Sequence, residues 1–138
     1  MIVVDTNVIA YLFLPGEYTA EARRTLQRDP RWTAPLLWRS ELRNVLATAM
    51  RRGHVALNDA LEVFDAAGDL MAGGEFEVAP EAVLRLAARS HCSAYDCEFV
   101  ALAQELGVVL VTGDRQIVEE FADTAQVLTQ FGADRTGA

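Results

Sequence analysis

Residues 2–7, Ile-Val-Val-Asp-Thr-Asn, join a short apolar run directly to an acidic residue and two polar ones. Three β-branched residues without polar alternation are typical of a strand that is buried on both faces of a sheet. Residues 108–111, Val-Val-Leu-Val, form a second such run, and Asp114 follows three residues later. We therefore expect two neighbouring parallel strands, each of which leads into an aspartate.

Weaker strand patterns alternate with helical patterns along the rest of the chain. Short strands are expected at residues 32–34, 76–78 and 125–128. Apolar residues at every third or fourth position predict helices at residues 21–28, 36–51, 59–71, 80–90, 94–106 and 116–121. This alternation predicts an α/β fold, a three-layer sandwich with a mainly parallel central sheet of about five strands.

Residues that usually mark helix ends fall at several of the expected boundaries. Asn58 is expected as an N-cap and Pro80 in a first helical turn. Gly53 and Gly107 are expected just past helix ends.

The length and composition indicate one globular domain. The chain has 138 residues, of which 51% are hydrophobic and 23% charged. We expect a single domain over residues 1–131 and a flexible tail over residues 132–138. No apolar stretch reaches the roughly 18 to 20 residues of a membrane span, and no basic signal segment is evident, so we expect a cytoplasmic protein without a membrane partner. Cys92 and Cys97 are expected as reduced, buried thiols.

The basic residues are all of one type. The formal net charge is −8, and each of the 12 basic residues is an arginine. The absence of lysine excludes a P-loop, which needs a lysine for phosphate. It also excludes phosphatases of the haloacid dehalogenase type and receiver domains, families that rely on a lysine beside their aspartates.

Four acids fall where an α/β sheet binds its ligands, beyond the carboxyl ends of the strands. Asp5 and Asp114 follow strands, and Asp96 and Glu41 lie in the first two turns of expected helices. Taken alone, each aspartate is explained equally well as a helix cap or first-turn acid and as a site residue. A cap is worth about 1 kcal/mol. Glu41 is different, because it borders the apolar stripe of its helix and turns partly toward the core.

Taken together, the four acids predict a metal site. Two carboxylates about 5 Å apart repel by roughly 3 kcal/mol at an effective dielectric constant of about 20, so such a cluster needs cations or protons. Oxygen ligands alone suit Mg²⁺ or Mn²⁺, and we regard His54 and His91 as structural or surface residues. Bound divalent ions would reverse the local charge, so the negative net charge does not exclude a nucleic-acid partner.

Four segments carry a family resemblance. They are VVDTNVI (3–9), RSELRNVL (39–46), SAYDCEFVALAQELG (93–107) and VVLVTGDRQI (108–117). In order and spacing they resemble the blocks of PIN-domain ribonucleases, and the chain length resembles VapC-type toxins of toxin–antitoxin pairs. The resemblance covers residues 2 to about 128.

The resemblance implies roles for individual residues. It implies that Asp5, Glu41, Asp96 and Asp114 are catalytic residues that bind metal, with Asn7 and Thr112 in supporting polar roles. A fifth acid is unassigned, because the next acids after Asp114 are Glu119 and Glu120.

The resemblance also implies an activity and partners. We expect Mg²⁺- or Mn²⁺-dependent hydrolysis of RNA that leaves a 5′ phosphate and a 3′ hydroxyl, a cognate antitoxin protein and a homodimer. Arginines near the acids could contact phosphate, namely Arg39, Arg43 and Arg115. Leu57, Leu61 and Phe64 could form a dimer surface or belong to the core.

Two other functions compete with this one. The first is a catalytically silent PIN-like binding protein whose acidic groove engages a partner. The completeness of the four acids favours the enzyme over it. The second is DNA cleavage by a flap-type nuclease, which is disfavoured because those enzymes carry long insertions that this chain lacks.

Overall fold

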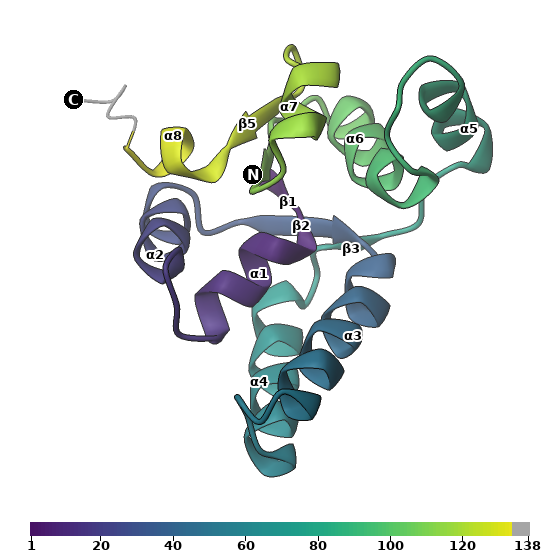
Figure 1. Ribbon diagram of the computed structural model, residues 1–138. Coiled ribbons are helices and arrows are strands. Elements are labelled where there is room, and N and C mark those ends of the chain that lie inside the picture. Colours follow the sequence, from purple (N-terminus) through teal and green to yellow (C-terminus); the bar gives the residue numbers. More distant parts are fainter. Residues whose placement is uncertain (134–138) are drawn as a thin grey trace.

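Strands and helices alternate through residues 1–133, the part of the chain that the computed structural model describes (Figure 1). The strands are β1 (Ile2–Val4), β2 (Trp32–Pro35), β3 (Glu75–Phe76), β4 (Leu110–Thr112) and β5 (Ala125–Val127). The helices are α1 (Thr6–Phe13), α2 (Thr19–Arg28), α3 (Leu37–Arg51), α4 (Leu57–Met71), α5 (Pro80–Ala88), α6 (Ala94–Leu106), α7 (Arg115–Glu120) and α8 (Leu128–Ala133).

The five strands form one parallel sheet in the order β3-β2-β1-β4-β5. The two strands expected as neighbours are neighbours: Val3 pairs with Leu110, and the backbone N–H of Asp5 donates to the carbonyl of Val111 at 2.9 Å. The chain builds outward from β1 through β2 to β3 and then returns to the other side of β1 for β4. The order of the strands therefore reverses between β1 and β4, the place where parallel sheets bind their ligands.

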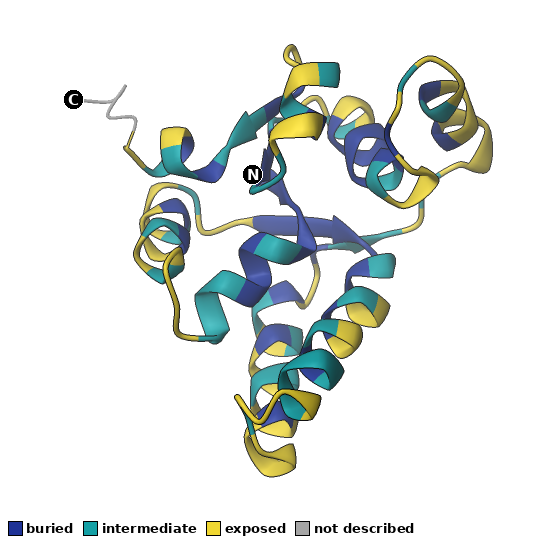
Figure 2. Ribbon diagram, in the orientation of Figure 1, coloured by how far each residue is buried: buried dark blue, intermediate teal, exposed yellow. Residues whose placement is uncertain are grey.

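Helices cover both faces of the sheet, which confirms the expected sandwich. Helix α6 packs on β1 and β2 with α5 outside it, whereas α1, α3 and α4 pack together on the opposite side (Figure 1). Every residue of β1 is buried, as its unbroken apolar run predicts (Figure 2). Every residue of β4 is buried too, but Val108 and Val109, the first half of the second run, precede the strand and are only partly buried. Helices α3 and α4 project from the body as a long hairpin.

Several expected boundaries are wrong. Helix α4 begins at Leu57 after the extended residue Ala56, so Asn58 lies inside the helix and is not its N-cap. The strand expected at residues 108–111 begins only at Leu110. The N–H of Val108 donates instead to the carbonyl of Ala103 at the end of helix α6. Pro80 at the start of α5 and Gly107 at the end of α6 are confirmed.

The C-terminal part differs from expectation as well. Leu128 was expected to end a strand, but it begins α8, a helix that the sequence analysis missed. That helix includes residues 132 and 133 of the expected tail, and residues 134–138 lie outside the described part. Cys92 and Cys97 are buried free thiols, as expected. Within residues 1–133 no helix combines the length and apolarity needed to cross a membrane.

Candidate active site

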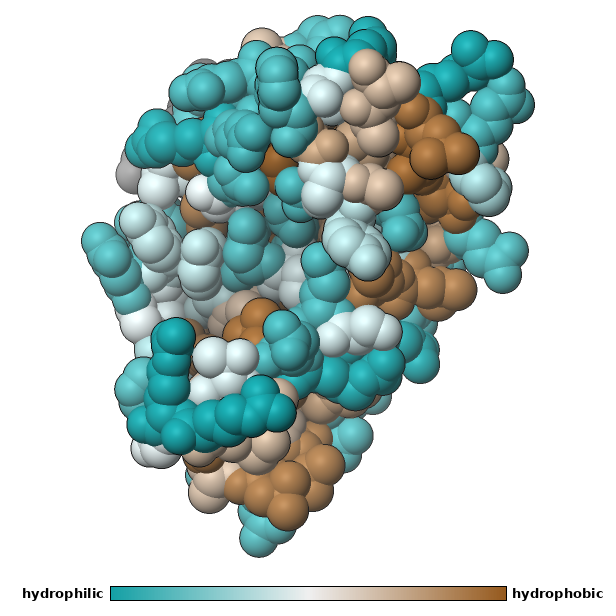
Figure 3. Space-filling view, turned by 45° about the vertical axis from the view of Figure 1, so that its right-hand side comes forward, coloured by the Kyte–Doolittle hydropathy of each residue, from teal (hydrophilic) through white to brown (hydrophobic). Residues whose placement is uncertain are grey.

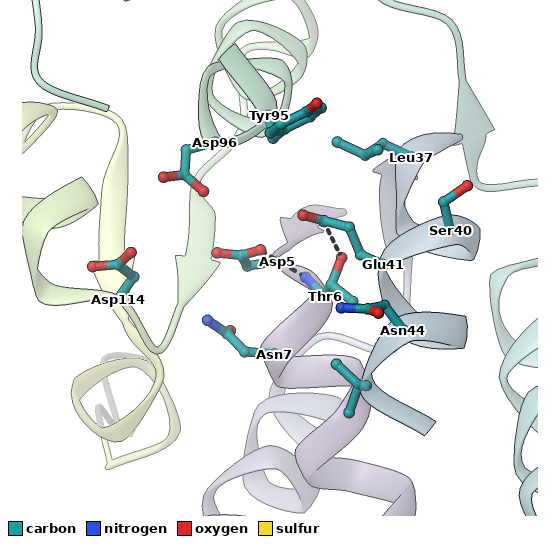
Figure 4. A pocket seen from close by; sticks show the side chains of 11 residues that line it. Asp5, Thr6, Asn7, Leu37, Ser40, Glu41, Asn44, Tyr95, Asp96 and Asp114 are labelled. Atoms are coloured by element: carbon teal, nitrogen blue, oxygen red, sulfur yellow. Dashed lines mark hydrogen bonds between the residues drawn. The ribbon is translucent and has the colours of Figure 1, made fainter. Parts of the chain in front are cut away.

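A cavity of about 420 Å³ opens where β1 and β4 end (Figure 4). The four acids predicted from the sequence and Asn7 all line it, although they come from different parts of the chain. The full lining is Asp5, Thr6, Asn7, Leu37, Ser40, Glu41, Asn44, Val45, Tyr95, Asp96 and Asp114. The structure thus brings the predicted acids to one place.

Asp5 lies at the base of this cavity and is 7% exposed. Its Oδ1 accepts from the N–H of Thr6 at 2.8 Å, and its Oδ2 accepts from the hydroxyl of Thr112 at 2.8 Å. Burial raises the pKa of Asp5 from 3.8 to about 7, because the two hydrogen bonds only partly offset the loss of water and Glu41 adds repulsion. Asp5 therefore needs a proton or a cation near neutral pH.

Glu41 faces Asp5 from helix α3 and is partly buried. Its Oε1 accepts from the hydroxyl of Thr6 at 2.7 Å. Burial raises the pKa of Glu41, and the charge of Asp96 raises it further. Thr6 is a site residue that sequence reasoning missed, since its bond to Glu41 depends on the packing of α1 against α3.

Asp96 and Asp114 close the other side of the cavity, each at the start of a helix (Figure 4). The N–H of Asp96 donates to the Ser93 hydroxyl at 3.1 Å, and Oδ1 of Asp114 accepts from the N–H of Gln116 at 2.9 Å. Burial raises the pKa of Asp96, and the charge of Asp114 adds to this effect. The capping and the site interpretations are thus compatible, because one carboxylate can cap a helix and face the cavity.

Thr112 connects the two strand-end acids from beneath the cavity. Its buried hydroxyl donates to Asp5 and accepts from the N–H of Asp114 at 3.0 Å. Thr112 does not line the cavity, and it reaches the site through these two hydrogen bonds. The supporting polar role expected for it has this geometric basis.

Asn7 anchors the loop that carries Asp114. Its Oδ1 accepts from the N–H of Gly113 at 3.1 Å. A Cβ at Gly113 would lie 3.0 Å from the ring of Tyr11 and 3.4 Å from Cγ of Asn7. The absence of a side chain at Gly113 thus favours this close approach of the loop to Tyr11 and Asn7.

The chemistry of the lining fits a hard cation. All the charged groups of the cavity are carboxylates, and no group of three acidic, histidine or cysteine side chains in the described part of the chain is already arranged to hold a metal ion. Mg²⁺ keeps several water ligands and usually takes only one or two protein carboxylates. A spread set of acids around a space wide enough for water therefore suits Mg²⁺ better than a close cage would.

None of the three arginines expected to contact phosphate lines the cavity. Arg39 forms a two-point ion pair with Glu75, through Nε at 2.5 Å and Nη2 at 2.7 Å. Arg43 donates to the Ser40 hydroxyl at 3.0 Å and lies over the ring of Phe64. Arg115 is exposed at the start of α7 beside Asp114.

The two unassigned acids lie outside the cavity as well. Glu120 accepts from the backbone of His91 and pairs with its Nδ1 at 2.8 Å, which lowers the pKa of Glu120. Glu119 is exposed on the same helix.

Several lining residues were not singled out from the sequence. Asn44 follows Glu41 by three residues on a helix, a spacing that places both on one face and could have identified it. Tyr95, which is 62% exposed, precedes Asp96 and stands at the rim (Figure 4). Glu98 is near the site too, since burial and the charge of Glu41 raise its pKa.

Comparisons with known proteins agree with this geometry. Residues 2–125 match the family model of the PIN domain. The chain is 31% identical to Ribonuclease VapC3 of Pyrobaculum aerophilum over 124 residues, which are 87% of this chain and 94% of that protein.

Solved structures share the fold. The crystal structure of PAE2754 from Pyrobaculum aerophilum superposes with a TM-score of 0.74 at 22% identity, covering 96% of this chain and 97% of the other. FitAcB from Neisseria gonorrhoeae superposes with a TM-score of 0.71 at 18% identity, covering 92% and 96%.

Proposed function

Since the chain belongs to the PIN-domain family, we propose that it is a metal-dependent endoribonuclease that hydrolyses RNA phosphodiester bonds with Mg²⁺ or Mn²⁺ as its cofactor. The observation that carries the proposal is the meeting of four acids at one cavity, with Asp5 buried at its base. The name of the related Ribonuclease VapC3 supports RNA as the substrate.

Asp5, Glu41, Asp96 and Asp114 are the residues that would hold the ion. When bound, the ion supplies Lewis-acid polarisation of the phosphate and lowers the pKa of the attacking water. Thr112 and the N–H of Thr6 fix the orientation of the Asp5 carboxylate, and the Thr6 hydroxyl fixes that of Glu41. These bonds keep the carboxylates in place before substrate arrives, so little reorganisation is needed during the reaction. Attack by water leaves a 5′ phosphate and a 3′ hydroxyl.

A toxin role with a cognate antitoxin protein, acting in the cytoplasm, is part of the proposal. The VapC name of the relative supports it. The free thiols Cys92 and Cys97 agree with a reducing compartment.

A homodimer is proposed on the apolar surface of α4. Leu57 is 60% exposed and Leu61 55% exposed, whereas Phe64 is partly buried and stacks on Trp38. Figure 3 shows hydrophobic surface at the end of the projecting hairpin. Sedimentation of the wild type against a Leu57→Ser, Leu61→Ser variant tests this: a dimer that the variant converts to monomer supports the proposal, and a monomeric wild type contradicts it.

The activity is tested by incubating labelled RNA with purified protein in Mg²⁺, in Mn²⁺ and in EDTA. We expect cleavage with either metal and none in EDTA, and products with 5′ phosphate ends. Asp5→Asn and Asp96→Asn should each lower the rate at least about a hundredfold, as loss of a group that stabilises the transition state does. Glu105→Gln removes an exposed acid from the same helix as Asp96 and should cleave normally.

Two results would contradict the proposal. Cleavage that persists in EDTA or in both aspartate variants would show that the acids are not the catalytic machinery. A well-folded wild type without cleavage in either metal would favour the silent binding protein instead.

A further inference from the structure

The acidic cavity continues along helix α3. A second cavity of about 280 Å³ is lined by Asn44, Val45, Thr48, Ala49, Arg52 and His54. Asn44 and Val45 line both cavities, so the two lie next to each other along α3, and we refer to them together as the groove. One end of this groove holds the acids, and the other end holds an arginine and a histidine.

The way helix α3 ends fixes the positions of Arg52 and His54. Gly53 adopts a left-handed conformation with φ of 74°. Its N–H donates to Met50 at 3.0 Å, and the N–H of His54 donates back to Ala49 at 2.9 Å. This pair of bonds is the Schellman motif. It folds His54 back against α3, so that the side chains of Arg52 and His54 both border the groove.

Arg52 and His54 are available to a ligand, in contrast to Arg39 and Arg43. Both are exposed, and within residues 1–133 neither side chain has a hydrogen bond, ion pair or ring contact. Arg39 is already paired with Glu75, and Arg43 is bonded to Ser40. The groove thus has one available cationic end in a chain whose net charge is −8.

We propose that Arg52 and His54 form a phosphate-binding subsite for single-stranded RNA whose scissile phosphate lies at the acids. Arg52 lies eleven positions after Glu41, about 16 Å along a helix, so the subsite binds a different phosphate of the same strand. The inference rests on the proposed ribonuclease function. It assigns the scissile phosphate to the acidic end of the groove and a second phosphate to the end at Arg52 and His54. Arg52 supplies charge and bidentate donors, and the His54 ring supplies a further donor.

The shape of the groove favours a single strand over a duplex. Asp5 lies 7% exposed at the base of the acidic cavity, so the scissile phosphate must enter the cavity to approach it. A duplex keeps its backbone on the outside of a rigid cylinder, whereas an unpaired strand can bend into a cavity and still follow the groove.

The test measures binding and cleavage separately. Binding of a labelled single-stranded RNA is followed by fluorescence anisotropy with Ca²⁺ in place of Mg²⁺, for the wild type, Arg52→Gln and His54→Gln. Arg51→Gln is the matched control. It removes the same charge at the neighbouring position, and the side chain of Arg51 does not line the groove. Circular dichroism verifies that all four proteins are folded.

We expect Arg52→Gln to weaken RNA binding about tenfold and His54→Gln several-fold, as for loss of one charged hydrogen bond. The slope of log affinity against log salt should fall by about 0.7 for Arg52→Gln, since one phosphate contact is lost. Arg51→Gln should stay within about twofold of the wild type and keep the slope. In Mg²⁺, Arg52→Gln should raise KM and leave kcat unchanged.

Failure of this inference is distinguishable from failure of the proposed function. If Arg52→Gln and Arg51→Gln bind RNA equally well and the wild type cleaves RNA, the subsite is wrong and the proposed function stands. This end of the groove would then be open to a protein segment instead. Arg52-dependent binding in a protein that does not cleave would support the subsite and overturn the catalytic proposal. Preference for duplex over single-stranded RNA would also contradict the subsite as stated.

Discussion

Replacing Asp5 by asparagine is expected to stabilise the metal-free protein above neutral pH. A raised folded-state pKa means that the folded protein binds the proton of Asp5 more tightly than the unfolded chain does. Wild-type stability should therefore fall as pH rises from 3.8, the ordinary pKa of the carboxyl, to about 7, and should change little from this group above that. The difference corresponds to about 4 kcal/mol at 1.36 kcal/mol per pH unit.

The substitution also has a cost. The hydroxyl of Thr112 donates to Oδ2 of Asp5, and an amide nitrogen at that position would forfeit this bond, about 1 kcal/mol. The net expectation is that Asp5→Asn is more stable than the wild type by about 3 kcal/mol at pH 8, and by less than about 1 kcal/mol at pH 5. Glu41 and Asp96, whose pKa values are also raised, leave some pH dependence in the variant.

Urea unfolding in EDTA measures this, with fluorescence of the buried Trp32 and Trp38 as the signal. Glu105→Gln, an exposed acid-to-amide change, should leave the stability unchanged at pH 8. Adding Mg²⁺ at 100 times its dissociation constant should stabilise the wild type by about 2.7 kcal/mol and Asp5→Asn much less. The reasoning would be refuted if Asp5→Asn were less stable than the wild type at pH 8 in EDTA, or if the difference were the same at pH 5.

Three further changes have definite expected outcomes. Thr112→Val removes a hydrogen bond that lowers the pKa of Asp5, so this pKa should rise above about 7 in carboxyl NMR titrations, and an unchanged value would contradict the bond. Gly74→Ala should destabilise by about 3 kcal/mol in urea, because a Cβ there would overlap the carbonyl oxygen of Trp32, and a loss below about 1 kcal/mol would disprove the close approach. Ser93→Ala should cost about 1 kcal/mol through the lost N-cap of α6, and equal stability of variant and wild type would show that the cap is dispensable.

The acids were predictable from the sequence because local rules place them. Unbroken β-branched runs identified β1 and β4 as central strands, and parallel strands direct their carboxyl ends to one edge. Asp5 and Asp114 followed from that rule alone. Their roles as metal ligands remain predictions that the variants above test.

The other parts of the site depend on contacts between distant residues, which a sequence does not display. Arg39 is two residues from Glu41, yet it pairs with Glu75 on β3, 36 residues away. Thr6 bonds to Glu41 only because α1 packs on α3. The short helix α8 was missed because its six residues follow directly on β5 and give too little periodicity.

The hydrogen bond from Thr112 to Asp5 joins residues 107 positions apart. Closing a loop of such length costs conformational entropy, and contacts of high sequence separation slow folding. During synthesis the ribosome would release Asp5 and Glu41 well before β4 emerges, and until then Asp5 has no β4 beside it and no Thr112 hydroxyl to hold it. A partly made chain would therefore carry these acids without an assembled site, and the cavity would form only once β4 has joined the sheet.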